Sequence, residues 1–288
     1  MANYCKYQKL EKYVSYDGVN WMPTGEYKKG NLIEYQSSDC PNPYLSYYLG
    51  LSAIDNCDFN FSNAIETAFT ETGPWTTVEA NAYIHCNAGD TILFRKTVSS
   101  SGSIGTFSAS IGHFEAQGNI MSLVYGDNFT SKTSLSGYNN VFQNLFKSCS
   151  GLTSIENLMM PATTLAEACY DKMFRNCTSL SAVPTDLLPA TTLAINCYSE
   201  MFEGCSSLRT APDLLASVGA YDCYVLMFYG CSSLNYVKCL LTTIDASSYT
   251  NTWMSGVPAS GTFVKARNVD WGQCRTSTIP CGWTVQNV

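Results

Sequence analysis

The second half of the chain carries a repeated pattern of apolar and polar positions. The pattern Cys-Tyr-x-x-Met-Phe-x-x-Cys-x-Ser-Leu occurs three times without gaps, and a related block precedes it. The closing cysteines Cys149, Cys177, Cys205 and Cys231 are separated by 28, 28 and 26 residues. A fixed period in the high twenties is typical of leucine-rich repeats, in which neighbouring units bury their apolar faces against each other. The pattern therefore predicts a solenoid over residues 119–245.

Each repeat is expected to contain a short helix with a constant inner face. At ~100° per residue, Cys169, Tyr170, Met173, Phe174 and Cys177 share one arc of the helical wheel. A glycine near the end of the block would close the helix in a left-handed conformation. Nine residues that vary between repeats lie on the opposite arc and are candidates for ligand binding, although simple solvation explains them equally well: Asp171, Lys172, Arg175, Ser199, Glu200, Glu203, Val225, Leu226 and Tyr229.

The rest of the chain is punctuated by turn residues and aromatic pairs. Residues 1–40 predict a hairpin element around Asp17-Gly18, a favoured tight turn. Residues 41–118 contain short strands at regular spacing and predict an antiparallel β-sandwich, with an irregular β-domain as the alternative. Residues 246–288 predict a β-rich cap. The expected fold class is thus α+β: an N-terminal hairpin and sandwich, then a leucine-rich-repeat solenoid with its cap.

Composition narrows the classes of partner. The chain has a formal net charge of −7 and a pI near 4.8, and it contains no run of basic residues. Phosphate-backbone binding needs clustered Lys and Arg, so nucleic acid is not an expected partner. No apolar stretch has the length of a membrane span, and no secretory signal is expected at the N-terminus.

Catalytic and cofactor signatures are not found. Most of the 14 cysteines recur inside the repeat and are expected to be reduced core thiols, with Cys274 and Cys281 as the pair best placed for a disulfide. The repeat cysteines are eight residues apart, too far along a helix to share one metal ion. His85 and Cys86 should face opposite sides of a strand. Glu200 and Glu203 lie on one outer face but lack the cleft that a glycosidase pair needs. We expect no enzyme activity and no cofactor.

The repeats resemble the leucine-rich repeats of BspA-like bacterial surface proteins. The resemblance rests on Cys-Tyr-x-x-Met-Phe-x-Gly-Cys-Ser-Ser-Leu and Leu-Pro-Ala-Thr-Thr-Leu over residues 140–245. The wider layout, including Tyr16-Asp-Gly18 and Gly118-Asn-Ile-Met-Ser-Leu123, is similar to proteins of gut Bacteroides-type bacteria and their crAss-like phages. This resemblance implies adhesion or host-surface binding and carries over no catalytic residue.

Three settings are compatible with these features. Without an export signal, the chain fits a phage virion surface protein, fibre-like or capsid-decorating, which is assembled in the host cytoplasm. Its N-terminal region would dock to other virion proteins, and its repeats would bind a host glycan or outer-membrane protein. A homo-oligomer is expected there, since multivalency offsets weak single-site binding. The alternatives are a bacterial cell-surface adhesin and a scaffold or enzyme accessory module.

Overall fold

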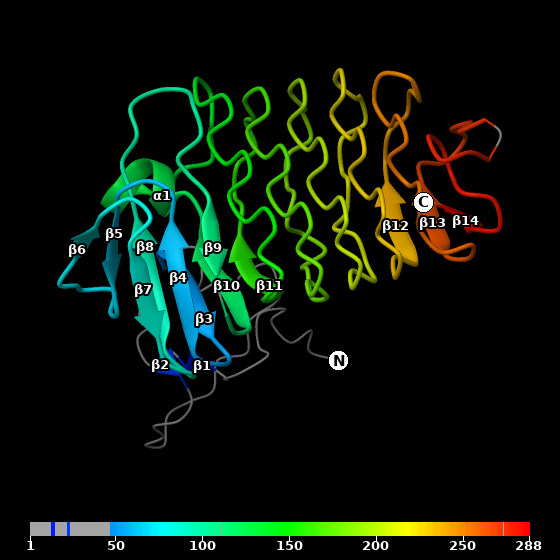
Figure 1. Ribbon diagram of the computed structural model, residues 1–288. Helices are drawn as coiled ribbons and strands as arrows, with labels where there is room; N and C mark the ends of the chain where they lie inside the picture. The colour runs from blue at the N-terminus through cyan, green and yellow to red at the C-terminus, as the bar shows by residue number, and fades with distance from the viewer. Residues whose placement is uncertain (1–12, 15–21, 24–46, 110, 273) are drawn as a thin grey trace.

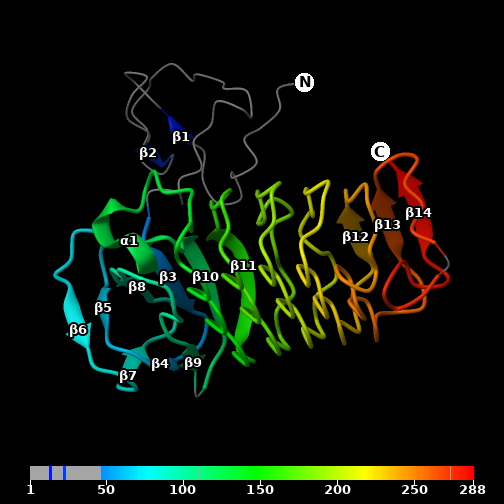
Figure 2. The ribbon, with the colours of Figure 1, turned by 90° about the horizontal axis from the view of Figure 1, so that it is seen from above.

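The computed structural model describes residues 13–14, 22–23, 47–109, 111–272 and 274–288. In the N-terminal region, strand β1 (Tyr13–Val14) pairs antiparallel with β2 (Met22–Pro23). The predicted turn at Asp17-Gly18 lies outside the described residues. From residue 47 onward the chain forms a β-rich end, a long array of stacked coils and a small C-terminal sheet (Figures 1 and 2).

Two sheets form the β-rich end. One has six strands in the order β11-β10-β3-β8-β5-β6, and the other has three in the order β7-β4-β9. Except for the parallel pair of β10 and β11, neighbouring strands in both sheets are antiparallel. The strand bounds are β3 Leu49–Ala53, β4 Cys57–Phe61, β5 Ile65–Ala68, β6 Thr76–Val78, β7 Tyr83–Cys86, β8 Thr91–Arg95, β9 Phe107–Ala109, β10 Phe114–Asn119 and β11 Leu152–Met159.

An alternating pattern of side chains places the core between these two sheets. In β4, Cys57, Phe59 and Phe61 are buried while the residues between them are half-buried, as expected for a strand with one face in the core. The Phe59 ring meets Phe114 of β10 at 5.0 Å between ring centres, and Phe107 of β9 meets Phe94 of β8 at 4.9 Å. Aromatic contacts therefore hold the two sheets together as layers.

Strand β10 joins the β-rich end to the repeats. It pairs antiparallel with β3 on one side and parallel with β11 on the other. Between them the chain passes through a short helix, α1 (Ser122–Tyr125), and a 3₁₀ turn, η2 (Gly126–Asn128). One continuous set of buried apolar side chains runs from β3 to Trp283, so the sheets and the repeats share a core.

Each repeat contributes a run of tight turns where a helix was expected. We call residues 141–149, 169–177, 197–205, 223–231 and 249–256 rungs, and their stack the turn ladder. Within a rung, alternate amides donate three residues back: Asp171 N to Ala168 O at 3.2 Å and Met173 N to Tyr170 O at 3.3 Å. The amides between them donate to the next rung, as in Lys172 N to Ser199 O at 2.8 Å. The rungs are thus cross-linked by backbone hydrogen bonds throughout the ladder.

Left-handed residues explain why no α-helix forms. Every fourth residue of a rung has positive φ, as shown by Ala168 at 50°, Lys172 at 57° and Asn176 at 60°. An α-helix requires φ near −63° at each residue, so one left-handed residue per turn interrupts it. Gly204 and Gly230, expected to end helices, have φ of 73° and instead occupy this recurring position.

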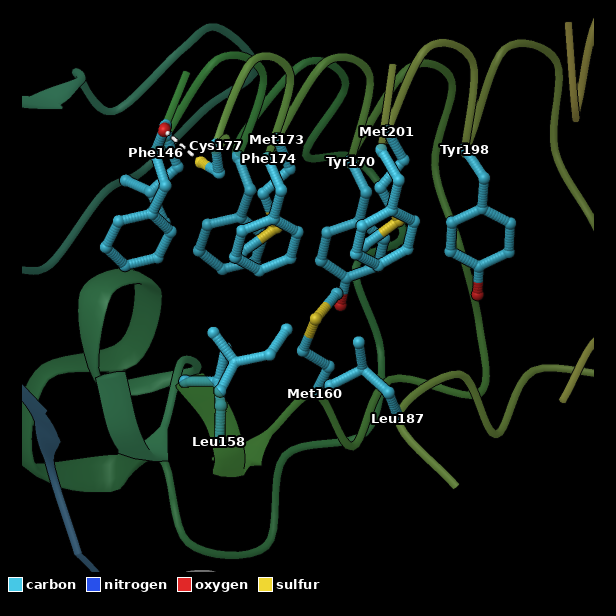
Figure 3. Close-up of a cluster of buried hydrophobic side chains, with 14 of the residues drawn as sticks. Phe146, Leu158, Met160, Tyr170, Met173, Phe174, Cys177, Leu187, Tyr198 and Met201 are labelled. Carbon is cyan, nitrogen blue, oxygen red and sulfur yellow. Dashed lines mark hydrogen bonds between the residues drawn. The ribbon is translucent and has the colours of Figure 1, made fainter. Parts of the chain in front are cut away.

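The inward side chains stack in columns from rung to rung. Phe146, Phe174 and Phe202 lie nearly parallel, with ring centres 5.6 and 5.5 Å apart. The columns point from the ladder toward Leu158, Met160 and Leu187 on the opposite wall of the core (Figure 3). The methionines Met173, Met201 and Met227 are fully buried. The inner face of each repeat is therefore as the sequence predicted, although the backbone that carries it is not.

The closing cysteines hold the columns in register. The Cys177 thiol donates to Phe146 O at 3.0 Å across the rungs (Figure 3), and Cys205 and Cys231 repeat the contact. Burial raises the pKa of Cys205 to about 12. Since only a thiolate is a good nucleophile, these thiols are structural hydrogen-bond donors.

The expected α+β fold with a leucine-rich-repeat solenoid is wrong. The described part of the chain is mostly β, with 26% of its residues in strands and 3% in helices, and its repeats are turns. The physical reason is the left-handed residue at every fourth position, which a pattern of apolar residues does not show.

The C-terminal region carries a parallel sheet of β12 (Tyr236–Cys239), β13 (Thr262–Lys265) and β14 (Thr284–Asn287).

Candidate binding surface

The turn ladder exposes two positions in each turn of four. In the fourth rung, Cys223, Tyr224, Met227 and Phe228 point inward, so the residues between them form the outer edge. All nine residues proposed from the sequence occupy such outer positions. Their burial differs, however. Asp171 and Ser199 are 4% and 5% exposed, and of the nine only Tyr229 is largely open to solvent.

Five of these nine residues form one charged cluster. Lys172 Nζ lies 3.0 Å from Asp171 Oδ2 and 3.0 Å from Glu200 Oε1. Arg175 binds Glu200 Oε2 at 2.6 Å and Glu203 Oε1 at 3.0 Å. Three carboxylates thus face two cations across two adjacent rungs, and each of the five groups has a partner of opposite charge. The cluster therefore contributes to the stacking of the rungs and leaves little charge for a ligand.

The two glutamates of the cluster differ in acidity. Burial and the contact with Glu200 raise the pKa of Glu203. Burial would also raise the pKa of Glu200, but the hydrogen bond with Glu203 and the contact with Lys172 outweigh it and lower that pKa. Such a divergence is seen in acid–base pairs of enzymes. Here both carboxyl groups are engaged by Arg175, so the divergence follows from packing.

The apolar part of the outer edge lies on the third and fourth rungs and on the residues just before them. Tyr221, Val225 and Tyr229 follow one another at four-residue spacing, and the two tyrosines are 60% and 42% exposed. Ile195, 46% exposed, lies beside them just before the third rung, where the Asn196 amide donates to Tyr221 O at 3.0 Å. We call Ile195, Tyr221, Val225 and Tyr229 the apolar edge.

Sequence reasoning missed half of the apolar edge. Tyr221 and Ile195 precede the aligned Cys-Tyr block, so a helical wheel that starts at the cysteine leaves them out. The signal was available: Tyr221 lies four residues before Val225 and eight before Tyr229. Leu226, by contrast, is half-buried and has φ of 53°, a conformation that an apolar side chain rarely adopts.

Other reactive side chains are engaged in local structure. His85 Nδ1 lies 2.8 Å from Asp58 Oδ1, and His113 Nδ1 lies 2.7 Å from Asp55 Oδ2. Cys86 is buried while His85 is exposed, so the two do face apart as predicted. Cys274 and Cys281 form a disulfide. In the part of the chain that the structure describes, no group of three His, Cys, Asp or Glu side chains could hold a metal ion.

Comparisons of this chain with protein-family models, curated proteins and solved structures found no match. Among the described residues, no helix combines the length and the apolar character that crossing a membrane requires. The function is therefore inferred from the side chains on the outer edge of the turn ladder.

Proposed function

We propose that the protein is a non-catalytic binding protein whose apolar edge contacts a partner on a host surface. The observation that carries this proposal is the line of Tyr221, Val225 and Tyr229, in which both tyrosines are exposed and Val225 is half-buried, with the exposed Ile195 beside it. Exposed apolar side chains gathered in one place are typical of interaction sites. Tyrosine suits such sites because it offers a large apolar ring and a hydroxyl that hydrogen-bonds in the same contact.

The backbone hydrogen bonds that hold the apolar edge in place support the same proposal. Glu200 N donates to Val225 O at 2.8 Å, and Gly204 N donates to Tyr229 O at 2.7 Å. On the other side, Tyr224 N donates to Tyr249 O at 2.9 Å. The backbone that carries the apolar edge is thus hydrogen-bonded to both neighbouring rungs. A rigid mount lowers the entropy cost of binding, because less freedom is lost on contact.

The setting we propose is a phage virion, in which the protein is fibre-like or capsid-decorating and docks through its N-terminal region. The partner class is a glycan or an outer-membrane protein of the host. The acidic net charge of −7 disfavours nucleic acid in this role. A bacterial cell-surface adhesin remains the alternative, supported by the same apolar edge. A homo-oligomer would strengthen either form of attachment.

Cell binding tests the proposed role of the apolar edge. Fluorescently labelled protein is incubated with a panel of gut bacterial strains, and bound fluorescence is measured by flow cytometry. Changing Tyr221→Ser together with Tyr229→Ser should reduce binding to the positive strains at least tenfold, since two central aromatic contacts are lost.

The matched control replaces two exposed aromatic residues outside the ladder, Tyr83 and Phe69, which are 67% and 63% exposed. Tyr83→Ser with Phe69→Ser should bind as the unaltered protein does. Equal losses in both double variants, or none in the ladder variant, would refute the role of the apolar edge. Purified virions that lack the protein would refute the virion setting alone.

A further inference from the structure

A cavity of about 500 Å³ lies beside the last rung of the turn ladder. Ala246, Ser247 and Asn251 line it from the ladder. Trp271, Arg275 and Ser277 line it from the segment that follows β13. Its volume is within the range of small-molecule sites. It is separate from the apolar edge on the third and fourth rungs, and the inference does not depend on the proposed function.

The segment that supplies Arg275 is held firmly against the ladder. Thr252 N donates to Ser277 Oγ at 2.9 Å, and Thr250 Oγ1 donates to Ser277 O at 2.7 Å. Trp253 Nε1 donates to Thr278 O at 2.9 Å. The Cys274–Cys281 disulfide closes the same loop. One wall of the cavity is therefore fixed before any ligand arrives, which lowers the entropy cost of binding.

Arg275 gives the cavity a positively charged wall. Its side chain is exposed, and among the described residues no carboxylate forms an ion pair with its guanidinium. Arg95 and Arg175, by contrast, each bind two carboxylates. A planar guanidinium recognises a carboxylate through two parallel hydrogen bonds. With respect to the described residues, Arg275 is thus available to anchor a carboxylate.

The remaining lining groups suit hydroxyls. The Asn251 side-chain oxygen accepts from Thr252 Oγ1 at 2.8 Å, which leaves its amide hydrogens for a ligand. Ser247 Oγ donates to Asp245 Oδ1 at 2.6 Å and so retains lone pairs that can accept. Trp271 also lines the cavity, but its indole N–H is buried away from solvent and takes no part in these hydroxyl contacts.

We propose that this cavity binds a small hydroxylated carboxylate of the sugar-acid class. Arg275 pairs with the carboxylate, and Asn251 and Ser247 hydrogen-bond with the hydroxyls. A neutral sugar of the same shape forms the hydroxyl contacts but leaves Arg275 unpaired. The carboxylate should therefore decide the affinity.

Calorimetric titration of the full chain with D-galacturonate and with D-galactose tests this assignment. The two probes share the ring and differ in the carboxylate. Galacturonate should bind at least tenfold more tightly than galactose, and Arg275→Gln should abolish that difference. Arg209→Gln, which removes an exposed arginine elsewhere in the repeats, should leave it intact.

A second measurement uses only the unaltered protein, and so tests the proposal even if the Arg275→Gln protein does not fold. Galacturonate binding to the unaltered protein should weaken as salt rises from about 50 to 500 mM, because salt screens an exposed ion pair. Equal affinities for the two probes would overturn the proposal, as would an undiminished preference for galacturonate in a folded Arg275→Gln protein. An absence of galacturonate binding would overturn it too. None of these outcomes bears on Tyr221 and Tyr229.

Discussion

At the residue scale, one conformational choice in every four residues decides the fold of the repeats. A left-handed residue at positions such as Asn176 and Gly204 turns the chain back so that the next two side chains again point inward. Asparagine and glycine tolerate this conformation, but Lys172, Glu200 and Leu226 adopt it as well. Those three residues give no sign of it in the sequence, because none of them favours left-handed backbone.

Also at the residue scale, two buried tyrosine hydroxyls lower the stability of the fold. Tyr170 and Tyr198 are fully buried in the stacked columns, and neither hydroxyl has a hydrogen-bond partner among the described residues. An unsatisfied buried polar group costs about 1–3 kcal/mol. Tyr198→Phe should therefore raise the free energy of unfolding by about 1 kcal/mol or more, measured by urea denaturation followed by fluorescence. A loss of stability in this variant would show that the hydroxyl has a partner, such as a buried water.

At the element scale, the pattern of inward residues was predictable and the element itself was not. On a helical wheel, residues four positions apart are separated by an angle of about 40°. Three residues at four-residue spacing therefore still fall within one arc of the wheel. A helical wheel therefore places Cys169, Met173 and Cys177 together whether the rung is helical or made of turns. Periodicity alone cannot separate these cases over nine residues. The inner face was identified correctly for this reason, and the α-helix was wrongly assigned for the same reason.

The charged cluster between the second and third rungs should make stability depend on pH. The pKa of Glu203 in the folded protein is raised above its usual value of 4.5. The contribution of Glu203 to the free energy of unfolding is therefore lost as the pH rises through that raised pKa. The folded-state pKa of Glu200 is lowered, so its contribution is present above pH 4.5 and lost as pH falls through the lowered value. Glu203→Gln, which resembles the protonated form, should raise the urea midpoint at pH 7.

Glu200→Gln is the matched variant on the same rung. It removes the partner of both Lys172 and Arg175, and should therefore lower the urea midpoint at pH 7. At a pH well below 4.5 the Glu203→Gln protein and the unaltered protein should converge. If both substitutions shift the urea midpoint in the same direction at pH 7, the opposite pKa shifts of the two glutamates do not determine how this cluster affects stability.

At the scale of the whole molecule, the sequence predicted the repeats and their inward residues, but not how the β-rich end continues into them. Strand β10 pairs with β3 and β11 at once, and Phe107 of β9 stacks on Phe146 of the first rung at 5.3 Å. Contacts of this kind depend on pairing between distant strands, which local patterns do not encode. At the other end, Trp253 stacks on Trp271 at 5.7 Å and closes the ladder.

The candidate surface was predicted only in part for a related reason. Asp171, Lys172, Arg175, Glu200 and Glu203 vary between repeats, which suggested contact with a ligand, but their ion pairs span neighbouring rungs. Such pairing becomes visible only when the rungs are placed side by side. The apolar edge was divided between residues that were included, such as Tyr229, and residues outside the aligned block, such as Tyr221.

Radical footprinting of the tyrosines, read by mass spectrometry in free and cell-bound protein, tests the central claim most directly. In the free protein Tyr221, Tyr229 and Tyr83 should be modified readily, whereas Tyr170, Tyr198 and Tyr224 should resist, because the ladder buries them. On cell binding, Tyr221 and Tyr229 should become protected while Tyr83 does not. Ready modification of Tyr170, Tyr198 and Tyr224 in the free protein would contradict the stacked ladder. Unchanged modification of Tyr221 and Tyr229 on bound cells would contradict the binding edge.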